Sequence, residues 1–217
     1  MVTPPLVAWM NPLPMELAPA LAARRRSVAA RTTGRVLDLG GWADHLGAYR
    51  LGGSGSGSEV ESVTMLDRIG DVRAGTGRED PEGLTRLDVA FDALRAAGLG
   101  PFDSIVSLIR LPLVENLDRF FRTAFDLLDD GGSLYFVEPV RRAGRVGRLL
   151  AMGGFVGRIA GGLHLDRDLP AEIRGRGMVV TDLDRFEVPT LSAPFRPFVE
   201  AVARWPATSP ESSPSRS

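Results

Sequence analysis

Short apolar runs alternate with amphipathic segments along most of the chain, a pattern that predicts strands separated by helices. Strands are expected at residues 36–37, 60–66, 84–89, 102–108 and 133–137. Helices are expected at residues 43–49, 91–97 and 117–128, the last with its apolar side chains on one face. Strands that alternate with helices favour right-handed βαβ units and a mainly parallel sheet.

The flanking segments extend this pattern at both ends. Residues 15–30 have a helix-forming composition, residues 169–176 predict another helix, and residues 178–188 and 195–204 predict two strands that pair antiparallel. The predicted organisation is an N-terminal helical segment (1–34), one α/β domain (35–205) and a disordered Ser/Pro-rich tail (206–217). Glycine-rich stretches at 52–58 and 70–83 are expected to be surface loops.

Composition is consistent with one α/β domain and narrows the classes of partner. The chain has 217 residues, of which 44% are hydrophobic and 24% charged, so it can bury a sizeable core. Its net charge of −1 gives no bulk attraction to nucleic acid. Cysteine is absent and only His45 and His164 supply imidazoles, so no metal site is expected.

Segment lengths and residue usage bear on the cellular location and on the source genome of the protein. No run approaches the roughly 20 apolar residues of a membrane span. Arg24, Arg25 and Arg26 follow the apolar part of the N-terminus, the reverse of a secretory signal. We therefore predict a cytoplasmic protein. All 26 basic residues are arginine, which together with abundant Ala, Gly and Pro indicates a GC-rich genome such as that of an actinobacterium.

The stretch with the clearest chemistry is the end of the first predicted strand. Asp38 closes this strand, and Gly40 and Gly41 follow at once. Glycines lack a Cβ, so the backbone there can turn sharply and approach a ligand closely. Dinucleotide-binding folds instead carry G-x-G-x-x-G directly after the strand and place the acidic residue on the next strand. That fingerprint is absent here, which disfavours an NAD(P)-dependent oxidoreductase.

The order of a carboxylate followed by glycines resembles the first motif, D/E-x-G-x-G-x-G, of class I S-adenosylmethionine-dependent methyltransferases. The helix at 117–128, the Asp-Asp-Gly-Gly turn and the strand after it resemble that family's L-x-P-G-G-x-L segment. Over residues 35–204 the chain resembles small-molecule methyltransferases of the ubiquinone/menaquinone-biosynthesis type. The resemblance implies a Rossmann-like fold with a mostly parallel seven-stranded sheet and helices on both faces. It implies S-adenosylmethionine as the cofactor and methyl transfer to oxygen, carbon or nitrogen of a small-molecule acceptor.

The resemblance also assigns cofactor-binding residues. Asp38 would lie under the amino-acid end of the cofactor, and the backbone of Gly40 and Gly41 would approach its methionine and ribose. Asp67, at the end of the second predicted strand, would accept both ribose hydroxyls. Asp88 matches the family's acidic residue near the adenine amino group. Each of these carboxylates can instead be an ordinary turn residue.

Acceptor-side residues are expected at the carboxyl end of the fourth predicted strand, where open α/β sheets place their chemistry. Ser107 is a further candidate for cofactor binding, and Ser107 and Arg110 are candidates for lining a substrate pocket. Methyl transfer from a sulfonium depends largely on alignment and desolvation. A hydroxyl acceptor would also need a general base, for which His164 and His45 are the candidate histidines.

Residues 141–168 are expected to form a mobile lid or substrate segment, because Gly153, Gly154, Gly157, Gly161 and Gly162 argue against one rigid helix. Its first 25 residues carry five arginines around an apolar group. One interpretation is a cover for an apolar or anionic acceptor, and another is weak contact with an anionic lipid surface. A solvated connection is the third.

Two residues depart from the methyltransferase pattern. Trp42 and Asp44 stand where the family has its second and third glycines. A tryptophan would crowd the ligand unless it turns away, and Asp44 would add negative charge near the cofactor carboxylate. The alternative hypothesis is therefore a non-catalytic methyltransferase-fold protein that acts in binding or as a scaffold, including at a membrane surface.

Overall fold

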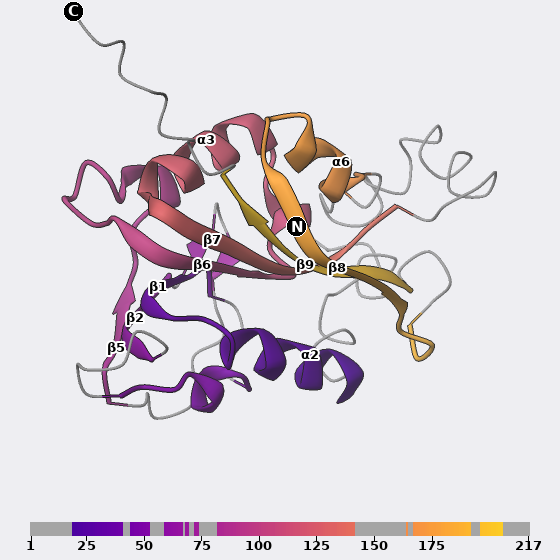
Figure 1. The fold of residues 1–217 in the computed structure, drawn as a ribbon, viewed down its shortest axis with the longest axis horizontal. Helices are drawn as coiled ribbons and strands as arrows, with labels where there is room; N and C mark the ends of the chain where they lie inside the picture. The colour runs from indigo at the N-terminus through magenta and orange to yellow at the C-terminus, as the bar shows by residue number, and fades with distance from the viewer. Residues whose placement is uncertain are drawn as a thin grey trace, which may run out of the picture.

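A seven-stranded sheet runs through the centre of the molecule (Figure 1). The computed structural model describes residues 19–40, 44–52, 59–66, 68–69, 72–73, 82–141, 164, 167–191 and 196–205. The strands of the sheet are β1 (Gly34–Asp38), β2 (Val60–Leu66), β5 (Leu84–Leu87), β6 (Phe102–Leu108), β7 (Leu128–Pro139), β8 (Val179–Glu187) and β9 (Pro197–Arg204). Two short strands, β3 (Arg68–Ile69) and β4 (Val72–Arg73), form a separate antiparallel pair.

The spatial order of the strands is β5-β2-β1-β6-β7-β9-β8. The first five of these strands are mutually parallel, whereas β9 is antiparallel to both β7 and β8. The predicted mostly parallel seven-stranded sheet and its antiparallel C-terminal pair are thus confirmed. Along the chain, β2 and then β5 are added on one side of β1, whereas β6 and then β7 are added on its other side. This reversal creates a switch point at the carboxyl ends of β1 and β6, the usual ligand site of open α/β sheets.

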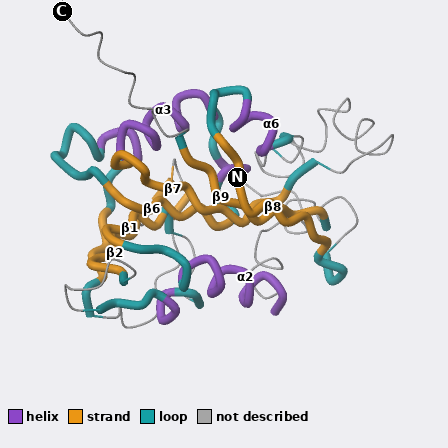
Figure 2. The backbone as a smooth tube through the Cα atoms, in the orientation of Figure 1, coloured by secondary structure: helices purple, strands orange, loops and turns teal. Residues whose placement is uncertain are grey.

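Helices cover both faces of the sheet. Helices α3 (Leu117–Leu127) and α6 (Leu169–Arg174) lie on one face and α2 (Pro19–Ala29) on the other (Figures 1 and 2). Successive strand residues point to opposite faces, so the apolar runs of the strands feed two cores. One core contains Leu37, Ile105 and Phe136 and packs against Phe121 of α3. The other contains Val36, Val106 and Val137 and packs against Leu21 and Val28 of α2.

Three predicted elements differ from the structure. In the described part of 43–49 the chain forms a turn at Asp44 and His45 and a short 3-10 helix, η2 (Leu46–Ala48), because a segment this short that contains Gly47 propagates a helix poorly. Residues 91–97 likewise begin with a 3-10 helix, η3 (Phe91–Ala93). Strand β7 starts five residues earlier than residue 133, because Leu128 already pairs with Phe102. The Asp129–Gly132 turn is therefore an irregularity inside the strand pairing.

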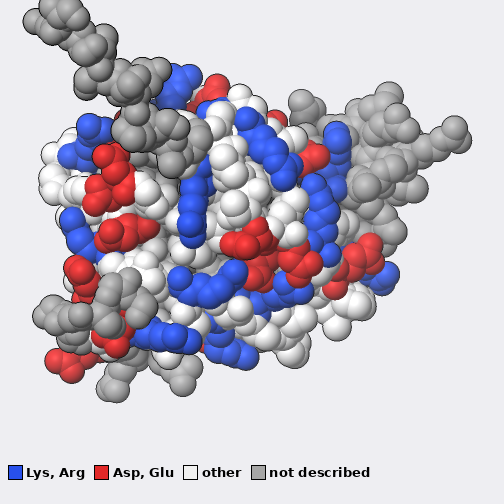
Figure 3. Space-filling model, in the orientation of Figure 1, with Lys and Arg blue, Asp and Glu red and all other residues white. Residues whose placement is uncertain are grey.

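Several predictions fall outside the described residues: the segment 1–18, most of the glycine/serine loop at 52–58, most of the segment 141–168 and the tail 206–217. In the part that is described, no helix is long and apolar enough to cross a membrane. No group of three or more metal-ligating side chains occurs among those residues either. Acidic and basic side chains are interspersed on the face shown in Figure 3.

Candidate functional site

The carboxyl ends of neighbouring strands bring together most of the polar side chains that the sequence singled out. Asp38 ends β1, and Ser107 lies near the end of β6 beside β7. Asp88 follows β5, two strands away from β1, and is exposed. Asp67, Gly41 and Trp42 lie outside the described residues. The site therefore consists of two buried polar clusters, one below the turn after β1 and one at the corner after β6.

Gly40 gives the turn after β1 its shape. Its φ of +75° lies in the left-handed region, and its amide donates to Asp38 Oδ1 at 2.8 Å. A Cβ built on Gly40 would lie 1.8 Å from the carbonyl oxygen of Leu66, the last residue of β2. Two independent features of the turn thus require a glycine at this position.

The Asp38 carboxylate is fully engaged inside the protein. Besides the Gly40 amide, its Oδ2 contacts His45 Nε2 at 2.6 Å and accepts from the Tyr49 hydroxyl at 2.7 Å. Asp38 is 1% exposed and His45 is 0% exposed. Asp38 therefore ties the residues before and after the glycine turn to each other, and its carboxylate supports the turn from below.

Buried charges in this cluster stabilise each other. Burial alone would raise the pKa of Asp38, but the charge of His45 and the hydrogen bonds from His45, Tyr49 and Gly40 outweigh burial and lower that pKa. Burial alone would lower the pKa of His45, but the charge of Asp38 and its hydrogen bond raise it to about 9. Burial and the adjacent carboxylate raise the pKa of Tyr49 well above its ordinary value. At neutral pH the cluster is an imidazolium–carboxylate pair with a neutral tyrosine.

A second ion pair neutralises Asp44. The Arg25 guanidinium, from α2, donates to Asp44 through Nε at 3.0 Å, and Arg25 is itself 0% exposed. Burial alone would raise the pKa of Asp44, but the His45 imidazole, whose Nδ1 lies 3.8 Å from Asp44 Oδ1, and the hydrogen bonds and charge of Arg25 outweigh burial and hold that pKa well below its usual range. Asp44 stands where the resembled motif has a glycine, and the negative charge that it adds there is balanced by the buried Arg25 guanidinium.

Glu138, a residue the sequence reasoning did not select, organises the second cluster. It is the next-to-last residue of β7 and is 0% exposed. Its Oε1 accepts from Ser107 Oγ at 2.6 Å, from the Arg110 amide at 3.0 Å and from the Leu111 amide at 3.3 Å. Burial raises the pKa of Glu138 to about 8 against the opposing hydrogen bonds. The signal in the sequence was a glutamate directly before Pro139 at the end of an apolar strand.

Arg110 connects the two clusters. It caps a 3-10 helix, η4 (Leu111–Leu113), and is 4% exposed. Its Nε donates to the Gly40 carbonyl at 2.7 Å. The corner from β6 into η4 passes through Ile109, whose φ of 59° is uncommon for a β-branched residue.

His164 lies beside the same corner. Its amide donates to the Pro112 carbonyl at 2.8 Å, and its side chain is partly buried. Nearby, the Arg167 guanidinium donates to the carbonyls of Leu111, Val114 and Glu115. The end of the predicted lid segment is thus attached to η4, next to the residue that contacts the Gly40 carbonyl.

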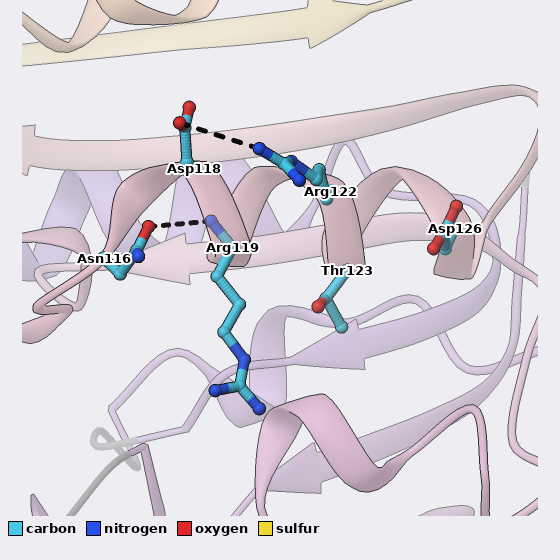
Figure 4. Close-up of a pocket in the computed structure, with 6 residues that line it drawn as sticks. All are labelled: Asn116, Asp118, Arg119, Arg122, Thr123 and Asp126. Carbon is cyan, nitrogen blue, oxygen red and sulfur yellow. Dashed lines mark hydrogen bonds and ion pairs between the residues drawn. The ribbon is translucent and has the colours of Figure 1, made fainter.

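A polar hollow elsewhere lies along the outer side of α3 (Figure 4). Its lining residues come from this one helix and its cap: Asn116, Asp118, Arg119, Arg122, Thr123 and Asp126. Asn116 caps the helix by accepting from the Arg119 amide at 3.0 Å. No strand end contributes to this hollow, so it is separate from the two buried clusters.

Comparisons with known proteins identify the fold. No protein-family model matches the chain, and no curated protein matches its sequence. Among solved structures, N-methyltransferase NodS from Bradyrhizobium japonicum WM9 in complex with S-adenosylhomocysteine is 17% identical, with a TM-score of 0.52 over 90% of this chain and 89% of NodS. The Burkholderia thailandensis 1,6-didemethyltoxoflavin-N1-methyltransferase, with bound 1,6-didemethyltoxoflavin and S-adenosylhomocysteine, is 16% identical, with a TM-score of 0.51 over 92% and 81%.

The [4+2]-cyclase SpnF is also similar, at 16% identity and a TM-score of 0.58 over 86% of this chain and 81% of the cyclase. The chain therefore has the class I methyltransferase fold, as the glycine turn and the order of elements predicted. At these identities the likeness concerns the fold, and the site has to be argued from this chain's own residues.

Proposed function

We propose that this protein is an S-adenosylmethionine-dependent methyltransferase that acts on a small-molecule acceptor. The observation that carries the proposal is the glycine turn that Asp38 supports at the carboxyl end of β1, beside the switch point of the sheet. Solved structures of the same fold, NodS among them, contain S-adenosylhomocysteine. This cofactor supplies a methyl group on a sulfonium, and the protein has to align the acceptor with it and exclude water.

The residues around the turn fit such a cofactor. Gly40 lets the backbone pass closely over the strand ends, and the buried Asp38–His45 pair keeps that backbone in place. Arg25 balances the charge of Asp44, which removes one objection to an anionic cofactor carboxylate at this turn. We assign the ribose contact to Asp67 and the adenine contact to Asp88, as the resemblance implies.

The two histidines receive different roles. Because the pKa of His45 is raised to about 9, its imidazole is protonated at neutral pH and offers no lone pair for proton abstraction. We therefore assign His45 to supporting the turn. His164 lies beside η4 and keeps the role of general base for an acceptor that needs one.

The alternative is a protein of this fold without methyl transfer. One observation favours it: a [4+2]-cyclase shares the fold with a TM-score of 0.58. Within the chain, Asp38 is hydrogen-bonded by Gly40, His45 and Tyr49, and a purely structural role in holding the turn explains these three contacts equally well.

Calorimetric titration with S-adenosylmethionine and S-adenosylhomocysteine separates these readings. Micromolar binding that is lost in Asp67→Ala and kept in Asp129→Ala supports the proposal. Asp129 is the matched control, because it is an exposed aspartate near the opposite end of the sheet. Folded wild-type protein that shows neither binding heat nor thermal stabilisation by either ligand would instead favour the alternative, a protein of this fold without methyl transfer.

A further inference from the structure

The corner after β6 has the form of an anion-binding concavity made by backbone amides. Ile109 adopts a left-handed conformation and Arg110 a right-handed one. This alternation turns successive amides toward one point, and the amides of Arg110 and Leu111 both donate to Glu138 Oε1. A buried β-branched residue in the left-handed region persists only where its surroundings impose it. Here Glu138 supplies the acceptor that holds the corner.

Arg110, whose amide is held at this corner, also contacts the glycine turn after β1 to which the cofactor is assigned. Arg110 donates its amide to Glu138 and its Nε–H to the Gly40 carbonyl, and the Gly40 amide donates to Asp38. Glu138, Arg110, Gly40 and Asp38 therefore form a continuous hydrogen-bonded chain across the carboxyl ends of β7, β6 and β1. A change in the charge of Glu138 therefore acts on the glycine turn through Arg110.

We propose that Glu138 is a positioning residue for the cofactor turn: in its protonated form it sets Arg110 against the Gly40 carbonyl, and loss of its proton releases that contact. The inference rests on the proposed function, because the turn that Glu138 positions is the one assigned to the cofactor.

The hydrogen bonds indicate where the proton sits. Oε1 accepts all three donors, while Oε2 is buried and has no hydrogen-bond partner among the described residues. The proton therefore belongs on Oε2, where a carboxylate charge would be poorly solvated. The raised pKa of about 8 agrees with this arrangement and places ionisation just above neutral pH.

The groups packed against Glu138 show which cation an ionised Glu138 carboxylate would attract. From β6 it faces the Ser107 hydroxyl, and across the β9 pairing it faces Val199. Arg110 is the cation whose charge acts on it directly, whereas Arg167 reaches the same corner through the Leu111 carbonyl. Glu200 is paired with Arg24 and Arg31, on the α2 side of the sheet. An ionised Glu138 would therefore compete with the neutral Gly40 carbonyl for the Arg110 guanidinium.

The first test is independent of any ligand. The Arg110 side-chain Nε–H signal is followed by ¹⁵N NMR of the full chain from about pH 6 to about pH 9, a range that brackets the ionisation, and is assigned by its loss in Arg110→Lys. We expect the signal to shift with a midpoint near pH 8 in the wild type. In Glu138→Gln, an uncharged isostere of the protonated acid, it should keep its low-pH position throughout. A signal that titrates identically in both proteins overturns the proposal.

The second test measures affinity for S-adenosylhomocysteine over the same pH range. We expect wild-type affinity to fall about tenfold as pH rises through about 8, the equivalent of one charge-assisted hydrogen bond. Glu138→Gln should bind as the wild type does at low pH and stay constant. Glu138→Ala, which leaves no acceptor for the corner, should bind at least tenfold more weakly at every pH where it is folded. Equal pH profiles for the wild type and Glu138→Gln count against the positioning role.

Together the two tests distinguish a failure of the proposed function from a failure of the positioning role of Glu138. A wild type that does not bind S-adenosylhomocysteine contradicts the proposed function, and the Arg110 signal then decides whether Glu138 positions the turn. A wild type that binds while its Arg110 signal is unaffected by pH leaves the proposed function standing and overturns the role of Glu138.

Discussion

The carbonyl oxygen of Leu66 occupies the space in which residue 40 would carry a side chain. A Cβ built on Gly40 would approach that oxygen to 1.8 Å, and the φ of Gly40 is +75°. The end of β2 and the turn after β1 are therefore in backbone contact, immediately before Asp67. This contact explains why one glycine of the resembled motif is indispensable here even though Trp42 and Asp44 stand at later positions.

Gly40→Ala should lower the free energy of unfolding by about 3 kcal/mol or more, because it adds backbone strain to a collision with backbone that cannot move aside. Gly98→Ala is the matched control: its φ is +74°, but nothing lies within 4 Å of the added Cβ, so about 1 kcal/mol is expected from strain alone. Urea denaturation of both variants checks the difference. Equal losses would mean that the turn moves away from Leu66 without cost.

The ion pair between Arg25 and Asp44 should show strong coupling. Asp44→Asn removes a carboxylate from a fully buried guanidinium and should cost about 2 kcal/mol, less than for a fully buried pair because the Asp44 side chain is 34% exposed. Arg25→Met replaces the cation with an apolar side chain of similar length. The double variant should be more stable than the sum of the two single losses predicts, as measured by a double-mutant cycle. Additive losses would indicate that the pair does not neutralise Asp44.

The hydrophobic pattern predicted most of the fold, because strands buried on both faces produce continuous apolar runs. Strands β2 and β6 have the predicted bounds, and helix α3 ends one residue before the predicted position. The pattern could not separate a short helix from a 3-10 turn at residues 44–49, where the side chains of His45 and Tyr49 both reach across to Asp38 of strand β1.

Only part of the site was predicted, because a sequence motif reveals residues that are close together in the chain. Asp38 and Gly40 are neighbours in sequence, so a motif reveals them. Glu138 and Arg110 are 28 residues apart and meet only because β6 and β7 pair in parallel. A motif search cannot reveal a contact that depends on strand register.

The charge on His45 should stabilise the protein in a defined pH range. Its folded pKa is raised to about 9 from an ordinary value of 6.5, so its contribution is fully present below about pH 6.5 and is lost as pH rises through about 9. The difference in free energy of unfolding between the wild type and His45→Gln should therefore be largest near pH 6 and shrink toward pH 9. Tyr49→Phe is the control, because it removes a hydrogen bond to Asp38 without removing the imidazole charge. A His45→Gln difference that does not change with pH would mean that His45 is neutral in the folded protein.

Glu138 should give a pH dependence of stability that an isosteric amide removes. Because its folded pKa is raised to about 8 from 4.5, the protonated form contributes stability that is complete below about pH 4.5 and is lost progressively as pH rises through about 8. Relative to Glu138→Gln, the wild type should become less stable across this range, since the amide cannot ionise. Comparing these two proteins cancels the contribution of His45, which both retain. Urea denaturation at about pH 5, 7 and 9 measures the difference, and a constant difference would show that Glu138 is already ionised in the folded state at the lowest of these pH values.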